Sequence, residues 1–173
     1  MHRTETLKTP LYLAALTLGL LLQAGCSTTP PGPRGSQNTP TDIDYPARLT
    51  SEQAGDITIY AIGLVGTPYR YGGNTPDSGF DCSGLIGHVY RTHSQVSPPR
   101  TVAKLNGWGN AIAADRVRSG DLVIFTQRGQ VNHAGIYVGQ GRFVHAPSTG
   151  GEVRLDYLAS HYWSKQQVAY RRP

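Results

Sequence analysis

The chain has no apolar run long enough to cross a bilayer as a helix. Such a span needs roughly 20 residues, whereas the run from Leu11 to Leu22 covers about twelve. Arg3 and Lys8 precede this run, and the small pair Ala24-Gly25 follows it. A charged, an apolar and a small-residue region in this order are typical of a secretory signal peptide. We therefore predict that residues 1–25 are a signal peptide and not a transmembrane helix.

Cysteine is also scarce, with only two residues, Cys26 and Cys82. The segment from Leu22 to Cys26 resembles a bacterial lipobox, in which the cysteine thiol is acylated and becomes the mature N-terminus; Gln23 stands where a branched apolar residue is usual. A disulfide between the two cysteines is the alternative in an oxidising compartment. If Cys26 carries lipid, Cys82 is left as an unpaired thiol, which in an exported protein points to a reactive site.

No basic run with interleaved aromatic residues is present, so nucleic-acid binding is not expected. The net charge is +5, of which Arg3, Lys8 and Glu5 contribute +1, leaving +4 after residue 25. This mildly positive balance favours contact with anionic polymers such as cell-wall carboxylates.

Large apolar side chains are nearly absent from Ser27 to about Thr41, where Ser, Thr, Pro, Gly and Asn dominate. Such a composition cannot offset the entropy lost on ordering the chain. Residues 26–44 are therefore predicted to be a lipidated N-terminus and flexible linker, and residues 45–173 one folded domain without internal repeats.

The folded domain begins with helical patterns and ends with strand patterns. Apolar residues recur at helical spacing from Ser51 to Val65, behind a capping box of Thr50 and Gln53, and a second helix is expected to start near Cys82. Five short β-rich runs follow: Leu122–Phe125, Ala134–Val138, Arg142–His145, Val153–Leu155 and Val168–Arg171. This order predicts an α+β fold, with N-terminal helices packed on an antiparallel sheet of about five strands.

Three residues in this framework carry potential chemistry. Cys82 lies at the expected start of a helix, where free N–H groups and the macrodipole favour a thiolate and lower the thiol pKa; a buried cysteine that acts only as a small hydrophobe is the alternative. His133 opens an expected strand, and His145 lies on the next strand of a hairpin turned by Gly139–Gly141. If the strands pair, His145 can orient His133.

Two other interpretations of these histidines remain. They can be two surface histidines, or they can join Cys82 in a metal site. No close pair of ligands with the short spacing usual for zinc is present, so no metal is expected.

Six motifs occur in an order that resembles the NlpC family of papain-like bacterial cell-wall peptidases. They are Pro68–Gly73, Asp81–Gly84, Pro99–Thr101, Gly120–Phe125, His133–Gly139 and Val144–Ala146. The resemblance extends from about Ser51 to Arg172. Tyr71 stands where tryptophan is frequent and Leu105 where glutamine is, so the resemblance does not fix the shape of the substrate groove.

The resemblance implies a papain-like fold and a role for each site residue. Cys82 would be the nucleophile, His133 the general base and His145 the group that orients the base. Tyr69 would lie near the thiolate and help to stabilise the oxyanion together with backbone N–H groups at the helix start, where Ser83 lies; an ordinary packing role for Tyr69 is the alternative. No organic cofactor is implied.

The resemblance also implies a peptidoglycan substrate, cut between D-glutamate and the following diamino acid. Ser27 after the lipidated cysteine, in place of aspartate, is typical of lipoproteins sorted to the outer membrane, so a lipid anchor facing the periplasm is expected. Two alternatives belong to other classes: a catalytically silent wall-binding lipoprotein, and an amidase or acyltransferase that forms a thioester on another substrate. The sequence identifies no protein regulator.

Overall fold

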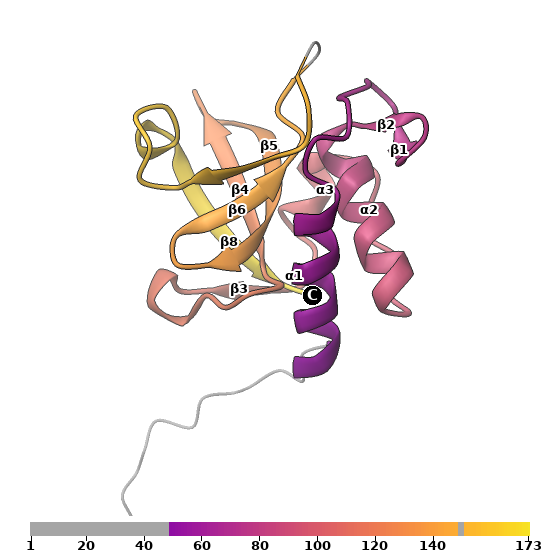
Figure 1. Ribbon diagram of the computed structural model, residues 1–173. Helices are drawn as coiled ribbons and strands as arrows, with labels where there is room; N and C mark the ends of the chain where they lie inside the picture. The colour runs from indigo at the N-terminus through magenta and orange to yellow at the C-terminus, as the bar shows by residue number, and fades with distance from the viewer. Residues whose placement is uncertain (1–48, 149–150) are drawn as a thin grey trace, which may run out of the picture. The chain divides into compact units, whose positions relative to one another are not determined.

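A computed structural model describes residues 49–148 and 151–173 (Figure 1). The predictions for the signal peptide, for Cys26 and for the linker fall outside the described residues. No helix in the described part is long and apolar enough to cross a membrane.

The first helix, α1 (Ser51–Gly63), starts at the capping box predicted from the sequence. The Thr50 hydroxyl accepts the Gln53 backbone N–H at 3.2 Å, and the Gln53 side chain accepts the Thr50 N–H at 2.9 Å. These two bonds satisfy N–H groups that no intrahelical partner reaches. The helix ends two residues before the predicted Val65.

The second helix, α2 (Cys82–His93), starts at the predicted residue because Asp81 caps it. The Asp81 carboxylate accepts the backbone N–H of Gly84 at 2.6 Å. A short third helix, α3 (Val102–Leu105), is capped by Thr101. Two single-turn 3-10 helices complete the helical elements of the described residues, η1 (Ala114–Arg116) and η2 (Trp163–Lys165).

The main sheet has six strands where about five were predicted. In chain order they are β3 (Asn110–Ile112), β4 (Leu122–Gln127), β5 (Gln130–Gly139), β6 (Arg142–His145), β7 (Arg154–Tyr157) and β8 (Gln167–Arg172). All neighbours are antiparallel in the order β3-β8-β4-β5-β6-β7. The extra strand is β3. A small separate ribbon pairs β1 (Asn74–Thr75) with β2 (Gly79–Phe80).

The helices cover one face of this sheet, and α1 and α2 lie side by side there (Figure 1). Alternate residues of β4 point to opposite faces. Leu122 and Ile124 join the core shared with the helices, whereas Val123 and Phe125 pack with Trp163 in a second cluster. Each large buried side chain contributes roughly 1.5–3 kcal/mol through removal from water. The predicted α+β class, with helices on an antiparallel sheet, is confirmed.

Candidate active site

Cys82 is the first residue of α2, where the helix meets β5. The residue is half-buried and its thiol is free. Backbone N–H groups of Ser83 and Ala134 hydrogen-bond toward the sulfur. Because Ala134 directly follows His133 in β5, this contact places the thiol beside the strand that carries the predicted base.

The surroundings of Cys82 raise the pKa of its thiol, so the predicted lowering is wrong. Burial is the main cause, and the negative charge of Asp81 adds to it. The N–H groups of Ser83, Cys82 and Ala134 act in the opposite direction but are outweighed. The helix start is present as predicted, yet desolvation penalises the thiolate more than the helix end stabilises it.

His133, the fourth residue of β5, begins a chain of hydrogen-bonded side chains. Its Nε2 lies 2.9 Å from Nδ1 of His145, and Nε2 of His145 lies 3.0 Å from Oδ2 of Asp156. This arrangement leaves Nδ1 of His133 as the ring nitrogen available to the thiol. The predicted proximity of the two histidines is therefore present, and Asp156 extends the chain.

Gly135 allows the two histidine-bearing strands to approach. A Cβ atom at this position would lie 2.9 Å from the Val144 carbonyl oxygen and 2.8 Å from Cδ2 of Phe143. Both distances are shorter than ordinary van der Waals contact, so any larger residue would push β6, and His145 with it, away from β5.

Both imidazoles are neutral at neutral pH. Burial, with smaller contributions from His145 and Arg154, lowers the pKa of His133 to about 3. Burial also lowers the pKa of His145 to about 4, although its hydrogen bond to Asp156 opposes this effect. A neutral imidazole is the form that can accept a proton, so His133 is ready to act as a base.

Asp156, on β7, is a site residue that the sequence reasoning missed. Its Oδ2 accepts hydrogen bonds from Trp163 Nε1 at 2.8 Å and from Arg154 Nε at 3.0 Å, besides its contact with His145. Burial raises the pKa of Asp156, but these hydrogen bonds outweigh it and leave the pKa lowered. The carboxylate is thus charged, and it holds the outer end of the histidine pair.

Trp163 forms one wall of this arrangement. Its indole stacks on the His133 ring with centroids 5.3 Å apart and an interplanar angle of 25°. Since its Nε1–H also bonds Asp156, one side chain limits the movement of both the base and the carboxylate. The tryptophan packs from η2, and no local pattern in the sequence indicates this contact.

Tyr69 lies close to Cys82, as the resemblance implied. Burial raises the pKa of its hydroxyl, and the negative charge of a Cys82 thiolate raises it further. Both side chains line the same hollow. The role of Tyr69 toward an oxyanion stays a prediction.

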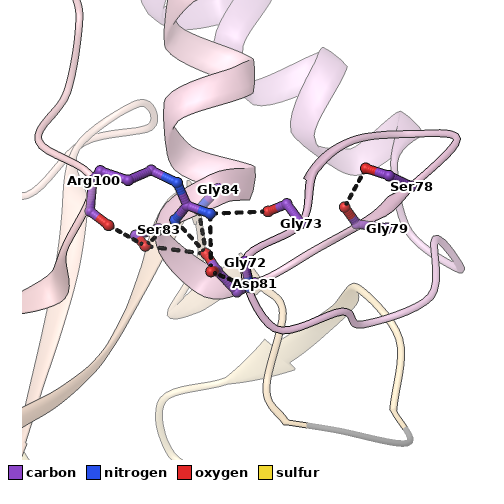
Figure 2. A network of polar contacts seen from close by, with 8 residues as sticks. All are labelled: Gly72, Gly73, Ser78, Gly79, Asp81, Ser83, Gly84 and Arg100. Atoms are coloured by element: carbon purple, nitrogen blue, oxygen red, sulfur yellow. Dashed lines mark hydrogen bonds and ion pairs between the residues drawn. The ribbon is translucent and has the colours of Figure 1, made fainter.

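The Ser83 hydroxyl is bonded to Arg100 and Asp81 (Figure 2). It lies 2.8 Å from the Arg100 carbonyl oxygen and 3.1 Å from Oδ1 of Asp81, and it accepts Arg100 Nη1 at 2.6 Å. What Ser83 presents to the sulfur is its backbone N–H. Its predicted contribution to an oxyanion site therefore rests on the main chain.

Arg100 and Asp81 form a bidentate ion pair at the start of α2 (Figure 2). Nη1 lies 2.7 Å from Oδ1, and Nη2 lies 3.0 Å from Oδ2. Arg100 also donates to the Gly73 carbonyl oxygen, and Asp81 accepts the Gly72 N–H. Such paired charge-assisted bonds fix geometry well, so this network ties the loop before α2 to the helix end that carries Cys82.

Two hollows flank the thiol and the base. One, of about 570 Å³, is lined by Cys82, Tyr69 and the largely exposed Tyr71. The other, of about 290 Å³, is lined by His133, Arg154 and Trp163 among others. Asn132 lines both, so the two hollows adjoin at the strand segment that carries the base.

Tyr71 and Leu105, the two positions that depart from the family pattern, lie in different surroundings. Tyr71 lines the hollow beside Cys82, whereas Leu105 is fully buried in the core. Within residues 49–148 and 151–173, no group of three or more His, Cys, Asp or Glu side chains is arranged to hold a metal ion.

A thiol at a helix start, set against a histidine chain on an antiparallel sheet, defines the class of papain-like α+β domains. Residues 66–172 match the family model described as NlpC/P60 family. The chain belongs to the NlpC/P60 family, and the resemblance seen in the sequence is confirmed.

Named relatives and solved structures agree with this membership. The chain is 41% identical over 112 residues to Murein DD-endopeptidase MepH of Escherichia coli K12, covering 62% of this chain and 41% of that protein. It is 38% identical over 110 residues to Gamma-DL-glutamyl hydrolase of Bacillus subtilis 168, covering 62% of this chain and 26% of that protein. The NlpC/p60 domain of peptidoglycan hydrolase SagA superposes with a TM-score of 0.59 at 29% identity, covering 67% of this chain and 96% of that one. The chain thus spans less than half the length of these two curated relatives.

Proposed function

We propose that this protein is a cysteine endopeptidase that cuts the stem peptides of peptidoglycan. The observation that carries the proposal is the juxtaposition of Cys82, at the start of α2, with the chain of His133, His145 and Asp156 on the sheet. The family membership supports it, as do the names of the relatives, which are a murein endopeptidase and a glutamyl hydrolase.

The proposed reaction starts from a neutral thiol and a neutral imidazole. His133 takes the Cys82 proton as the sulfur attacks the peptide carbonyl carbon, and the C–N bond then breaks with transfer of that proton to the leaving amine. Water hydrolyses the resulting thioester, giving a carboxylic acid and restoring the thiol. In the proposed reaction, backbone N–H groups at the start of α2 stabilise the oxyanion together with Tyr69.

The imidazolium that forms during this reaction is stabilised by two negative charges. The forming thiolate is one, and Asp156 is the other, since its charge raises the pKa of His133. An opposite charge close to a titrating group favours its charged form. The low resting pKa of His133 therefore applies to the free site and rises as the thiol loses its proton.

The proposed bond joins D-glutamate to the following diamino acid. Relatives are named both for this type of bond and for another: Gamma-DL-glutamyl hydrolase and Bifunctional muramidase/DL-endopeptidase CwlT on one side, and two murein DD-endopeptidases on the other. Purified sacculi digested with the protein and then with a muramidase are expected to give fragments that end in D-glutamate, identified by mass. Fragments that end in D-alanine would assign the bond to the DD type instead.

The same digestion separates the two alternative functions. A silent wall-binding lipoprotein would bind sacculi and release no fragment, and an acyltransferase would attach the acyl group to an added amine in place of water. The complete set of Cys82, His133 and His145 argues against a silent scaffold.

A lipid anchor at Cys26, directed to the outer membrane and facing the periplasm, is part of the proposal. Cys26→Ser is expected to release the protein from the membrane fraction and to remove incorporation of labelled fatty acid, because the acylated thiol is lost. The variant should keep its hydrolytic activity, since Cys26 lies outside the catalytic domain. Unchanged membrane association with unchanged lipid labelling would contradict the anchor.

A further inference from the structure

Arg154 carries an oriented guanidinium in the hollow beside His133. About half of its side chain (52%) is exposed. Arg154 lies opposite His145 in the β6–β7 pairing, so its place next to the catalytic strands is set by the sheet register. Asn132 and Trp163 line the same hollow, which at about 290 Å³ is close to the lower end of the roughly 300–1,000 Å³ typical of ligand sites.

One edge of the Arg154 guanidinium is bonded to Asp156, and its other N–H groups are available to a ligand. Nε and Nη2 both lie 3.0 Å from the same oxygen, Oδ2 of Asp156. No other acceptor among the described residues is bonded to the group. A guanidinium has five N–H donors in a fixed plane, so Nη1 and the second N–H of Nη2 remain free to bind a planar anion.

The hollow lies on the side where the leaving half of the substrate must lie. His133 has to pass its proton to the nitrogen of the breaking bond, and His133 lines this hollow. The acyl half stays bonded to Cys82, and the groups that face the sulfur line the other hollow. The residue that carries the leaving amine is therefore next to Arg154.

We propose that Arg154 is a specificity-determining residue that binds the carboxylate of the residue carrying the leaving amine. This inference rests on the proposed function, in which that residue is the diamino acid of the stem peptide. Arginine suits this role because its donors match the two oxygens of a carboxylate. A carboxamide at this position is neutral, and it offers one acceptor oxygen where the carboxylate offers two.

Binding of a carboxylate here also helps the proton transfer. The positive charge of Arg154 is one of the influences that lower the pKa of His133. A bound carboxylate offsets that charge, so the imidazolium that must protonate the leaving amine becomes easier to form. Recognition of the leaving residue and readiness of the base are thus linked through one side chain.

The test compares two cross-linked muropeptides that differ only in whether the free carboxyl group of the diamino acid is a carboxylate or a carboxamide. The wild-type protein is expected to prefer the carboxylate form in kcat/KM by about 10- to 100-fold, as for a charge-assisted hydrogen bond. Arg154→Gln should remove this preference, mainly by raising KM for the carboxylate form. Arg154→Lys should retain part of it, because the charge remains without the planar fork.

Arg128→Gln is the matched control, since it removes the same charge from the β4–β5 turn, outside this hollow. It should leave the preference unchanged. If Arg154→Gln lowers kcat equally on both muropeptides, the residue only positions Asp156 and the inference fails. Equal cleavage of both muropeptides by the wild-type protein would also overturn the inference, while the proposed function would stand. If the wild-type protein cleaves neither muropeptide, the inference and the proposed function are both overturned.

Discussion

Replacing Cys82 by serine or alanine is expected to lower hydrolysis of sacculi by at least about 10⁴-fold, as for the loss of a nucleophile in other covalent hydrolases. A serine hydroxyl is far harder to deprotonate than a thiol. Among the described residues no second cysteine is present to replace Cys82. Serine is well tolerated near a helix start, so Cys82→Ser should unfold at nearly the wild-type temperature. Release of peptide fragments from sacculi measures the loss of activity, and thermal unfolding followed by circular dichroism measures the stability.

The pH dependence of labelling gives a second measure of the same residue. Because burial and Asp81 raise the pKa of the thiol, little thiolate is present in the free protein at neutral pH. The rate of iodoacetamide labelling should therefore keep increasing above pH ~8.5, which is the ordinary pKa of a free cysteine thiol. Labelling should stop hydrolysis in proportion, and a chelator should have no effect. A fully labelled but active protein, or activity removed by a chelator and restored by zinc, would contradict the nucleophile.

The features that the sequence predicted correctly are those encoded by neighbouring residues. The capping box of Thr50 and Gln53 and the start of α2 at Cys82 are local patterns, and both occur as expected. Strand β3 was missed because it has three residues and pairs with β8, about sixty positions later. A strand this short acquires its conformation from its partner, which no local window shows.

The site was predicted in its parts but not in its electrostatics. His133 and His145 were brought together by a hairpin that the turn residues indicate. Asp156 was missed because the predicted strand ended at Leu155, one residue too early, and because its contact with Trp163 depends on the packing of η2. The predicted direction of the pKa shift of the Cys82 thiol was wrong for a related reason. A helix start can be recognised in a sequence, but the burial that outweighs its effect on the pKa cannot.

His133→Ala is expected to lower hydrolysis by at least about 10⁴-fold, because it removes the group that we propose moves the proton. His145→Ala should be milder, with a loss smaller than that of His133→Ala by about 10- to 100-fold, since an orienting group contributes less than the proton carrier. The activity of the wild-type protein should extend well below pH 6.5. The pKa of His133 is about 3 in the folded state, so the base stays unprotonated in that range.

Stability against pH provides the control that separates a lost base from a lost fold. In the unfolded chain both histidines titrate near the ordinary value of about 6.5, whereas in the folded state their pKa values are about 3 and about 4. As the pH falls below about 6.5, the unfolded state binds protons that the native state does not, and the free energy of unfolding decreases toward pH 3. His133→Ala removes one of these groups, so its unfolding free energy should decrease less steeply between pH 6.5 and 4, as measured by urea unfolding. An active His133→Ala protein would exclude His133 as the base, and a variant with the wild-type pH slope would show that this histidine titrates normally in the folded protein.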